Sequence, residues 1–103
     1  MQSYSEQLRS QLEEHRIMLV LAKVRRAESI KQHDAVKELR DFVLESPIVS
    51  DNQKALLLEQ EKEWKASIDD LVELISKIEA RIAELEEDRK TIEELEDILG
   101  VQQ

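Results

Sequence analysis

Few residues of this chain have side chains suited to chemistry, and the histidines, His15 and His33, come first among them. Neither has a histidine or carboxylate four residues away, so neither matches the spacing with which a helix presents two metal ligands. His15 falls between Leu12 and Leu19 on an apolar stripe, which favours a histidine packed in a helix contact. Cysteine is absent, which excludes thiolate ligands and thiol nucleophiles. We therefore predict no catalytic residue, no metal and no cofactor, and a protein that is not an enzyme.

Carboxylates are the most abundant reactive groups, and they gather in residues 84–88 and 93–97. A helix spreads such runs around its circumference, and they lack the glycine and loop geometry of a calcium site. Paired-carboxylate catalysis also needs a partly dry pocket, which an exposed helix does not supply. We interpret these acids as a candidate docking face for a basic protein, with Glu84, Glu87, Asp88, Glu94 and Asp97 as its members.

The basic segment 23–26 could contact phosphate, but the charge of the rest of the chain opposes this. The net charge is −9, and residues 47–103 account for all of it because residues 1–46 hold equal numbers of acids and bases. Such a balance disfavours nucleic acid and anionic membranes as partners. We expect the basic segment to pair with acids of the same chain, no direct contact with nucleic acid, and no small-molecule substrate.

The composition is typical of long helices. The chain has 103 residues with one glycine, one proline and 38% charged residues, too few turn formers for many reversals of direction. Its longest uncharged apolar run, residues 17–22, is far shorter than a membrane span and is flanked by charges unlike those of a secretory signal. We expect an intracellular, cytoplasmic protein with a single all-α domain over residues 1–103.

The first predicted helix covers residues 3–45 and begins with the capping box Ser3–Glu6. Apolar residues at helical spacing predict an inward stripe that changes phase after Leu19. A bend near His33 and Asp34 would give a three-helix bundle as an alternative. The predicted inward residues are Tyr4, Leu8, Leu12, Leu19, Val20, Val24, Ala27, Ala35, Leu39 and Phe42.

Pro47 predicts a turn over residues 46–50, because proline cannot continue a helix and disfavours helix in the residue before it. A second capping box at Ser50–Gln53 starts a helix over residues 51–99, and Gly100 is a suitable stop. So short a connection makes the two helices antiparallel neighbours. With facing residue numbers adding to roughly 97, Leu12 lies near Leu85, and the cations from Arg16 to Lys31 lie level with Asp69, Asp70, Glu73 and Glu79.

The second helix carries a heptad repeat over six heptads, which strongly predicts coiled-coil packing. Position d is apolar throughout, in Leu57, Trp64, Leu71, Ile78, Leu85, Ile92 and Leu99. Position a is apolar only in the middle, with Glu61, Arg89 and Glu96 as polar exceptions. Apolar residues also flank the repeat, which predicts a protein interface formed by Trp64, Ile68, Leu71, Val72, Leu74, Ile75, Ile78, Ile82 and Leu85.

The predicted fold is therefore a long antiparallel helical hairpin whose apolar face is too wide for one helix pair. Two copies that form a four-helix bundle would cover that face, and another helical protein is the alternative partner. We expect a non-enzymatic assembly module: a coiled-coil subunit, adaptor or scaffold. The rival hypothesis is a small acidic inhibitor or chaperone-like protein that binds a basic surface of its partner.

Overall fold

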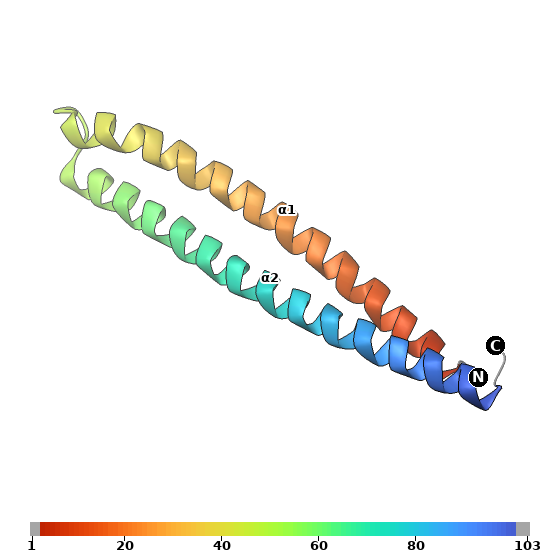
Figure 1. Cartoon of the computed structure of the whole chain (residues 1–103). Helices are drawn as coiled ribbons and strands as arrows, with labels where there is room; N and C mark the ends of the chain where they lie inside the picture. Colours follow the sequence, from red (N-terminus) through yellow and green to blue (C-terminus); the bar gives the residue numbers. More distant parts are fainter. Residues whose placement is uncertain (1–2, 101–103) are drawn as a thin grey trace. The chain divides into compact units, whose positions relative to one another are not determined.

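The computed structural model describes residues 3–100, and all regular structure in that range is α-helix (Figure 1). Helix α1 spans Tyr4–Glu45 (42 residues) and helix α2 spans Asp51–Leu99 (49 residues). The predicted all-α hairpin is confirmed. Helix α1 continues past His33 and Asp34, so the three-helix alternative is wrong.

The helix ends are set by the predicted capping residues. The Glu6 N–H donates a hydrogen bond to Ser3 Oγ over 3.2 Å and caps α1. At the start of α2 the capping box is reciprocal, because the Gln53 N–H donates to Ser50 Oγ (3.2 Å) and the Ser50 N–H donates to Gln53 Oε1 (3.0 Å). Gly100 ends α2 with a positive φ of 71°, a conformation that favours glycine.

The capping box at Ser50 gives a first prediction. We expect Ser50→Ala to lower the free energy of unfolding by about 1 kcal/mol, because the Gln53 N–H loses its acceptor. The thermal midpoint, followed by circular dichroism, measures the change. Ser10→Ala, at an exposed position inside α1, is the control and should leave the midpoint unchanged or slightly raised. Equal midpoints for Ser50→Ala and Ser10→Ala would contradict the capping role.

The contacts divide the molecule into two units. Unit 1 joins the start of α1, up to residue 21, to the end of α2, from residue 74. The two segments run antiparallel, and ion pairs between them join Arg9 to Glu93 (3.0 Å) and Arg16 to Glu86 (2.9 Å). Unit 2, residues 22–73, is a hairpin around the turn at residues 46–50.

Unit 1 contains the densest apolar packing. Leu8, Leu12 and Leu85 form a buried cluster, and Leu12 and Leu85 are 0% and 1% exposed. Ile82 and Ile92 pack against this cluster from α2. Burial of side chains of this size contributes about 1.5–3 kcal/mol each, so unit 1 holds much of the hydrophobic stabilisation.

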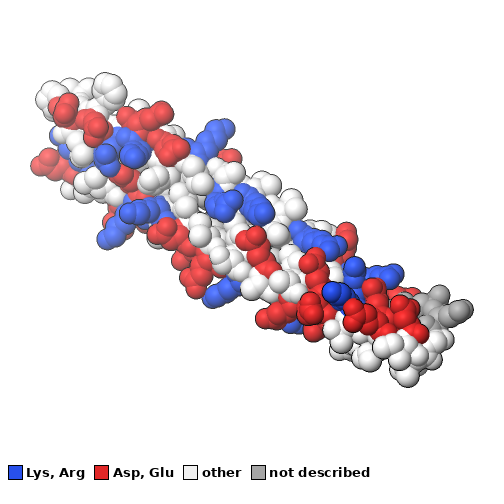
Figure 2. Space-filling model, in the orientation of Figure 1, with Lys and Arg blue, Asp and Glu red and all other residues white. Residues whose placement is uncertain are grey.

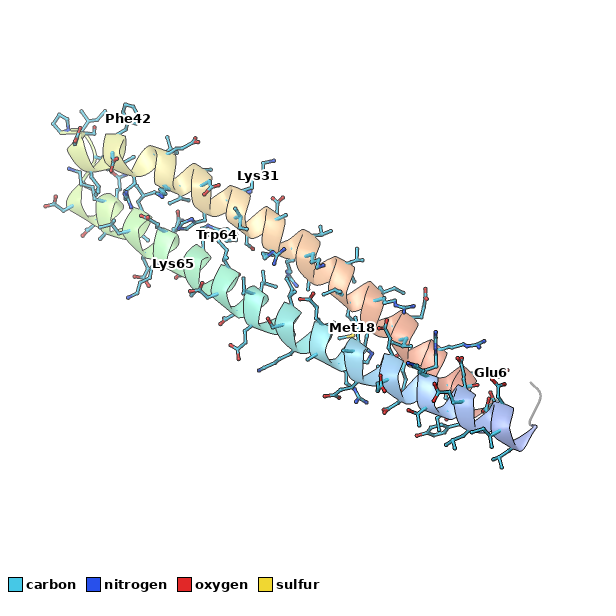
Figure 3. All side chains as sticks on the ribbon, in the orientation of Figure 1. Glu6, Met18, Lys31, Phe42, Trp64 and Lys65 are labelled. Carbon is cyan, nitrogen blue, oxygen red and sulfur yellow. The ribbon has the colours of Figure 1, made fainter. Side chains whose placement is uncertain are left out.

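Unit 2 is packed less tightly. Within residues 22–73, all of which the structure describes, only Ala22 and Ser29 are buried. Trp64, Ile68 and Leu71 are half-buried, and Figure 3 shows Trp64 directed toward α1. Small and polar residues of α1 thus face larger apolar residues of α2.

The inward face of α1 differs from the predicted stripe. Its less exposed residues follow one heptad repeat without a change of phase, whereas Tyr4, Val20, Val24, Leu39 and Phe42 are exposed. The predicted phase change is therefore wrong. The regular seam of α2 selects the residues of α1 that are in phase with it, even where these are polar. The inward positions are Ser5, Leu8, Leu12, His15, Leu19, Ala22, Arg26, Ser29, His33, Val36, Arg40 and Val43.

The heptad pattern of α2 is matched by its exposure, with one exception. The d positions from Leu57 to Ile92 are buried or half-buried, but Leu99 is exposed. The reason is that α1 begins at Tyr4, and Ser5 already hydrogen-bonds Glu96 (3.4 Å). No part of α1 is left to cover Leu99.

The predicted alignment is confirmed for the apolar residues, because Leu12 and Leu85 lie in one buried cluster, but the ion pairs of unit 1 join other partners than predicted. Arg16 was expected level with acids before residue 80, but it pairs with Glu86. Side chains of a helix lean toward its N-terminus, so residues at the same level of an antiparallel pair lean in opposite directions, and the side chains that lean toward each other are offset along the pair. Long side chains therefore meet partners about one turn beyond their own level. The acidic end of α2 consequently meets Arg16 as well as Arg9.

Candidate interaction surfaces

The predicted interface residues of α2 fall into two groups. Ile75, Ile78 and Leu85 are buried, and Trp64, Ile68, Leu71 and Ile82 are half-buried. All seven occupy a or d positions, the positions of α2 that face α1. Only Val72 and Leu74 are exposed, at positions beside the seam. Most residues of α2 that were predicted to bind another protein therefore pack against α1 of the same chain.

A second apolar surface lies on α1 in unit 1. Ile17, Val20 and Leu21, here called the outer patch, are all more than half exposed. With Arg16 they line a shallow hollow. The outer patch is the exposed part of the uncharged apolar run at residues 17–22, within which Ala22 is buried and Leu19 is half-buried on the inward side.

Both signs of charge surround the outer patch. Glu13 and Glu14 precede Ile17 by one helical turn, and Arg16 lies on the other side of the patch. All three side chains are exposed, and Arg16 pairs with Glu86 at its edge. A surface with both signs can be complementary to itself, as a symmetric dimer requires.

The predicted acidic docking face is partly neutralised. Glu84 pairs with Arg81 (2.9 Å), and the neighbouring acid Glu93 pairs with Arg9 (3.0 Å) and Arg89 (3.7 Å). Within residues 3–100, no ion pair of the structure involves the other four predicted members, which are all exposed: Glu87, Asp88, Glu94 and Asp97. Acids and bases elsewhere on the visible face are interspersed (Figure 2).

A third surface lies at the turn end of unit 2 and was not predicted. Leu39, Phe42, Ile48 and Leu56, here called the turn-end patch, are exposed by 58%, 78%, 92% and 63%. Figure 2 shows uncharged side chains gathered at this end, and Figure 3 shows Phe42 directed away from α2. Leu39 and Phe42 were predicted to lie on the inward stripe, so an exposed apolar surface was not expected at this end.

The two histidines lie in the seam between α1 and α2. His15 Nδ1 is 2.7 Å from the Gln11 carbonyl oxygen of its own helix. His33 Nδ1 is 3.9 Å from the Asp34 carboxylate. Over residues 3–100, neither helix has an apolar stretch long enough to cross a membrane.

Comparison with known proteins identifies no relative. No family model matches the chain, and no curated protein or solved structure shows significant similarity to it. A functional proposal therefore depends on the surfaces described above.

Proposed function

We propose that the protein is a non-enzymatic assembly module, a coiled-coil hairpin that pairs with a second copy of itself. The observation that supports this proposal is the exposure of Ile17, Val20 and Leu21 outside the seam. Contiguous exposed apolar side chains on a helix usually mark a protein interface. Pairing of two hairpins through the outer patch gives a four-helix assembly, and the closed two-fold symmetry limits it to a dimer.

The heptad exposure pattern of both helices supports the coiled-coil part of the proposal. Side chains at a and d insert between those of the opposite helix, and polar a residues such as Glu61 restrict the alignment. The role that fits is that of a subunit, adaptor or scaffold. The module presents helical surfaces to its partners and has no reaction of its own.

Light scattering tests the dimer. We expect a molar mass of about twice the chain mass of 12.1 kDa, maintained in about 1 M salt because the contact is apolar. Leu21→Glu should reduce the mass to that of the single chain, since it places a charge in the outer patch. Leu56→Glu is the matched control, because Leu56 is as exposed as Leu21 (63%) but lies in unit 2. A monomer at every concentration would contradict the proposal.

An acidic binder is the second candidate, favoured by the exposed acids Glu87, Asp88, Glu94 and Asp97. Binding through this face would be largely electrostatic and would weaken steeply as salt rises, unlike the apolar contact. Replacing Glu94 by Gln and Asp97 by Asn would then weaken binding to a basic protein without changing the molar mass of the free chain.

A further inference from the structure

We propose that the turn-end patch is the docking site for a basic amphipathic helix of another protein. The inference rests on the assembly function proposed above, to which it adds a surface and the chemistry of one partner. The patch lies entirely within unit 2 and does not overlap the outer patch.

The patch forms one surface because its helical residues share a side of the hairpin. Leu39 and Phe42 are three residues apart and therefore neighbours on α1. In an antiparallel pair, equivalent heptad positions of the two helices lie on the same side of the seam. The inward residues Arg40 and Val43 are positions a and d of the heptad repeat of α1, which makes Phe42 position c and Leu39 the adjacent position g. Leu56, which precedes the d residue Leu57, is position c of α2. Ile48 lies in the turn between the two helices, at the same end of the unit, and is exposed.

The exposure of the patch is unusual for side chains of this kind. Phe42 is 78% exposed and Ile48 is 92% exposed, although aromatic and branched aliphatic residues are normally buried. Isolated exposed apolar residues need no explanation, but four together at one end of a unit indicate an interface.

The charges beside the patch identify the partner. Glu38 and Glu45 flank Phe42 at four residues before and three after it, and Glu59 lies three residues after Leu56. No Lys or Arg occupies any position three or four residues from Leu39, Phe42 or Leu56. The cation next to Leu39 in the sequence, Arg40, pairs with Glu61 in the seam at 2.6 Å and with Asp41 at 3.4 Å. The apolar patch is therefore bordered by acids.

This border excludes two other occupants by charge. A second copy docked patch to patch would bring Glu38, Glu45 and Glu59 against the same acids. An anionic membrane would repel them in the same way. A helix with apolar residues at i, i+3 and i+7, flanked by Lys and Arg, matches both the apolar surface and its border.

Fluorescence anisotropy of a labelled synthetic peptide tests the proposal with the full chain. The probe is a helical peptide with leucines on one face and lysines on both flanks, and the control peptide has glutamates in place of the lysines. We expect the lysine peptide alone to bind, and Phe42→Ala or Leu56→Ala to weaken binding by about tenfold, as expected for central apolar anchors. Glu38→Gln with Glu45→Gln should weaken binding and reduce its salt dependence.

Val24→Ala is the matched control, because Val24 is about as exposed as Leu56 (62% and 63%) and belongs to neither the turn-end patch nor the outer patch. It should leave peptide binding unchanged. All variants replace exposed side chains, and circular dichroism verifies that their helicity equals that of the parent chain. The proposal is overturned if the two peptides bind equally, if the parent chain does not bind the lysine peptide, or if Val24→Ala and Phe42→Ala weaken binding equally.

Two further outcomes would assign the patch to another occupant and also overturn the proposal. One is a loss of molar mass on Phe42→Ala, which would identify a second copy. The other is binding to phosphatidylglycerol vesicles that Phe42→Ala abolishes, which would identify lipid. Failure of the dimer proposal is read separately, from the molar mass of Leu21→Glu, so the two proposals fail independently.

Discussion

Leu85→Asp is expected to unfold unit 1 and remove most of the helical signal of the protein. Leu85 is 1% exposed and packs with Leu8 and Leu12 in the buried cluster. The substitution removes apolar contacts and buries a carboxylate against the apolar side chains of Leu8 and Leu12. Together these effects exceed about 4 kcal/mol, a large part of the 5–15 kcal/mol that keeps a small domain folded.

Circular dichroism during thermal unfolding measures this effect. Leu58→Asp is the control, since it adds the same charge to the same helix at a position that is 46% exposed. Its midpoint should stay within a few degrees of the parent value, because an exposed substitution changes stability by about 0.5 kcal/mol or less. Similar losses in both variants would mean that added negative charge, and not burial, determines the stability of the helices.

The position of Leu85 could be predicted from the sequence, whereas the inward face of α1 could not. Alternating steps of three and four place Leu85 at position d of a repeat that is apolar over most of α2. In α1 the apolar residues are more numerous outside the seam than inside it, and Val20 and Val24 suggested a false change of phase. Continuing the steps of four and three from Leu8 and Leu12 reaches His15 and the other inward positions without interruption. That signal was available, but polar residues on the path obscured it.

The turn-end patch was not predicted for the same reason, the assignment of exposed apolar residues of α1 to the inward face. Leu39 and Phe42 are apolar and helically spaced, so they are assigned to the core when apolar character alone decides. Whether such a residue faces inward depends on the phase of the partner helix. Arg40, between them, faces α2 instead because Glu61 lies opposite it. At the turn end the Arg40–Glu61 pair is therefore compatible with the phase that the regular seam of α2 selects in α1, and Leu39 and Phe42 stay exposed.

Arg40→Ala is expected to lower the free energy of unfolding by about 2 kcal/mol, through the effect on Glu61. The Arg40 Nη1 to Glu61 Oε1 distance is 2.6 Å, and the Glu61 side chain is only 17% exposed. Without the guanidinium, a largely buried carboxylate keeps its desolvation cost but loses its partner. Arg40 itself is 32% exposed, so water reaches the pair and the loss is smaller than the ~3–5 kcal/mol typical of fully buried pairs.

Urea unfolding of a double-mutant cycle separates the interaction energy between Arg40 and Glu61 from the contribution of each residue alone. Arg40→Glu combined with Glu61→Arg should recover most of the stability that either charge reversal loses alone, because the pair re-forms with its ends exchanged. Independent, additive losses would show that Arg40 and Glu61 do not interact in solution.

Arg40→Leu combined with Glu61→Leu should be more stable than the parent chain, and this is the more informative result. Two leucines at facing a positions gain apolar contact without the desolvation of two charges, and buried pairs replaced in this way often gain 1–4 kcal/mol. The Arg40–Glu61 pair would then serve to align the two helices and not to raise the free energy of unfolding, since a mismatched register would leave Glu61 without a cation. We therefore expect the double leucine variant to show, in light scattering, a mixture of masses that the parent chain does not. A variant that is more stable and has a single mass equal to that of the parent would rule out the alignment role.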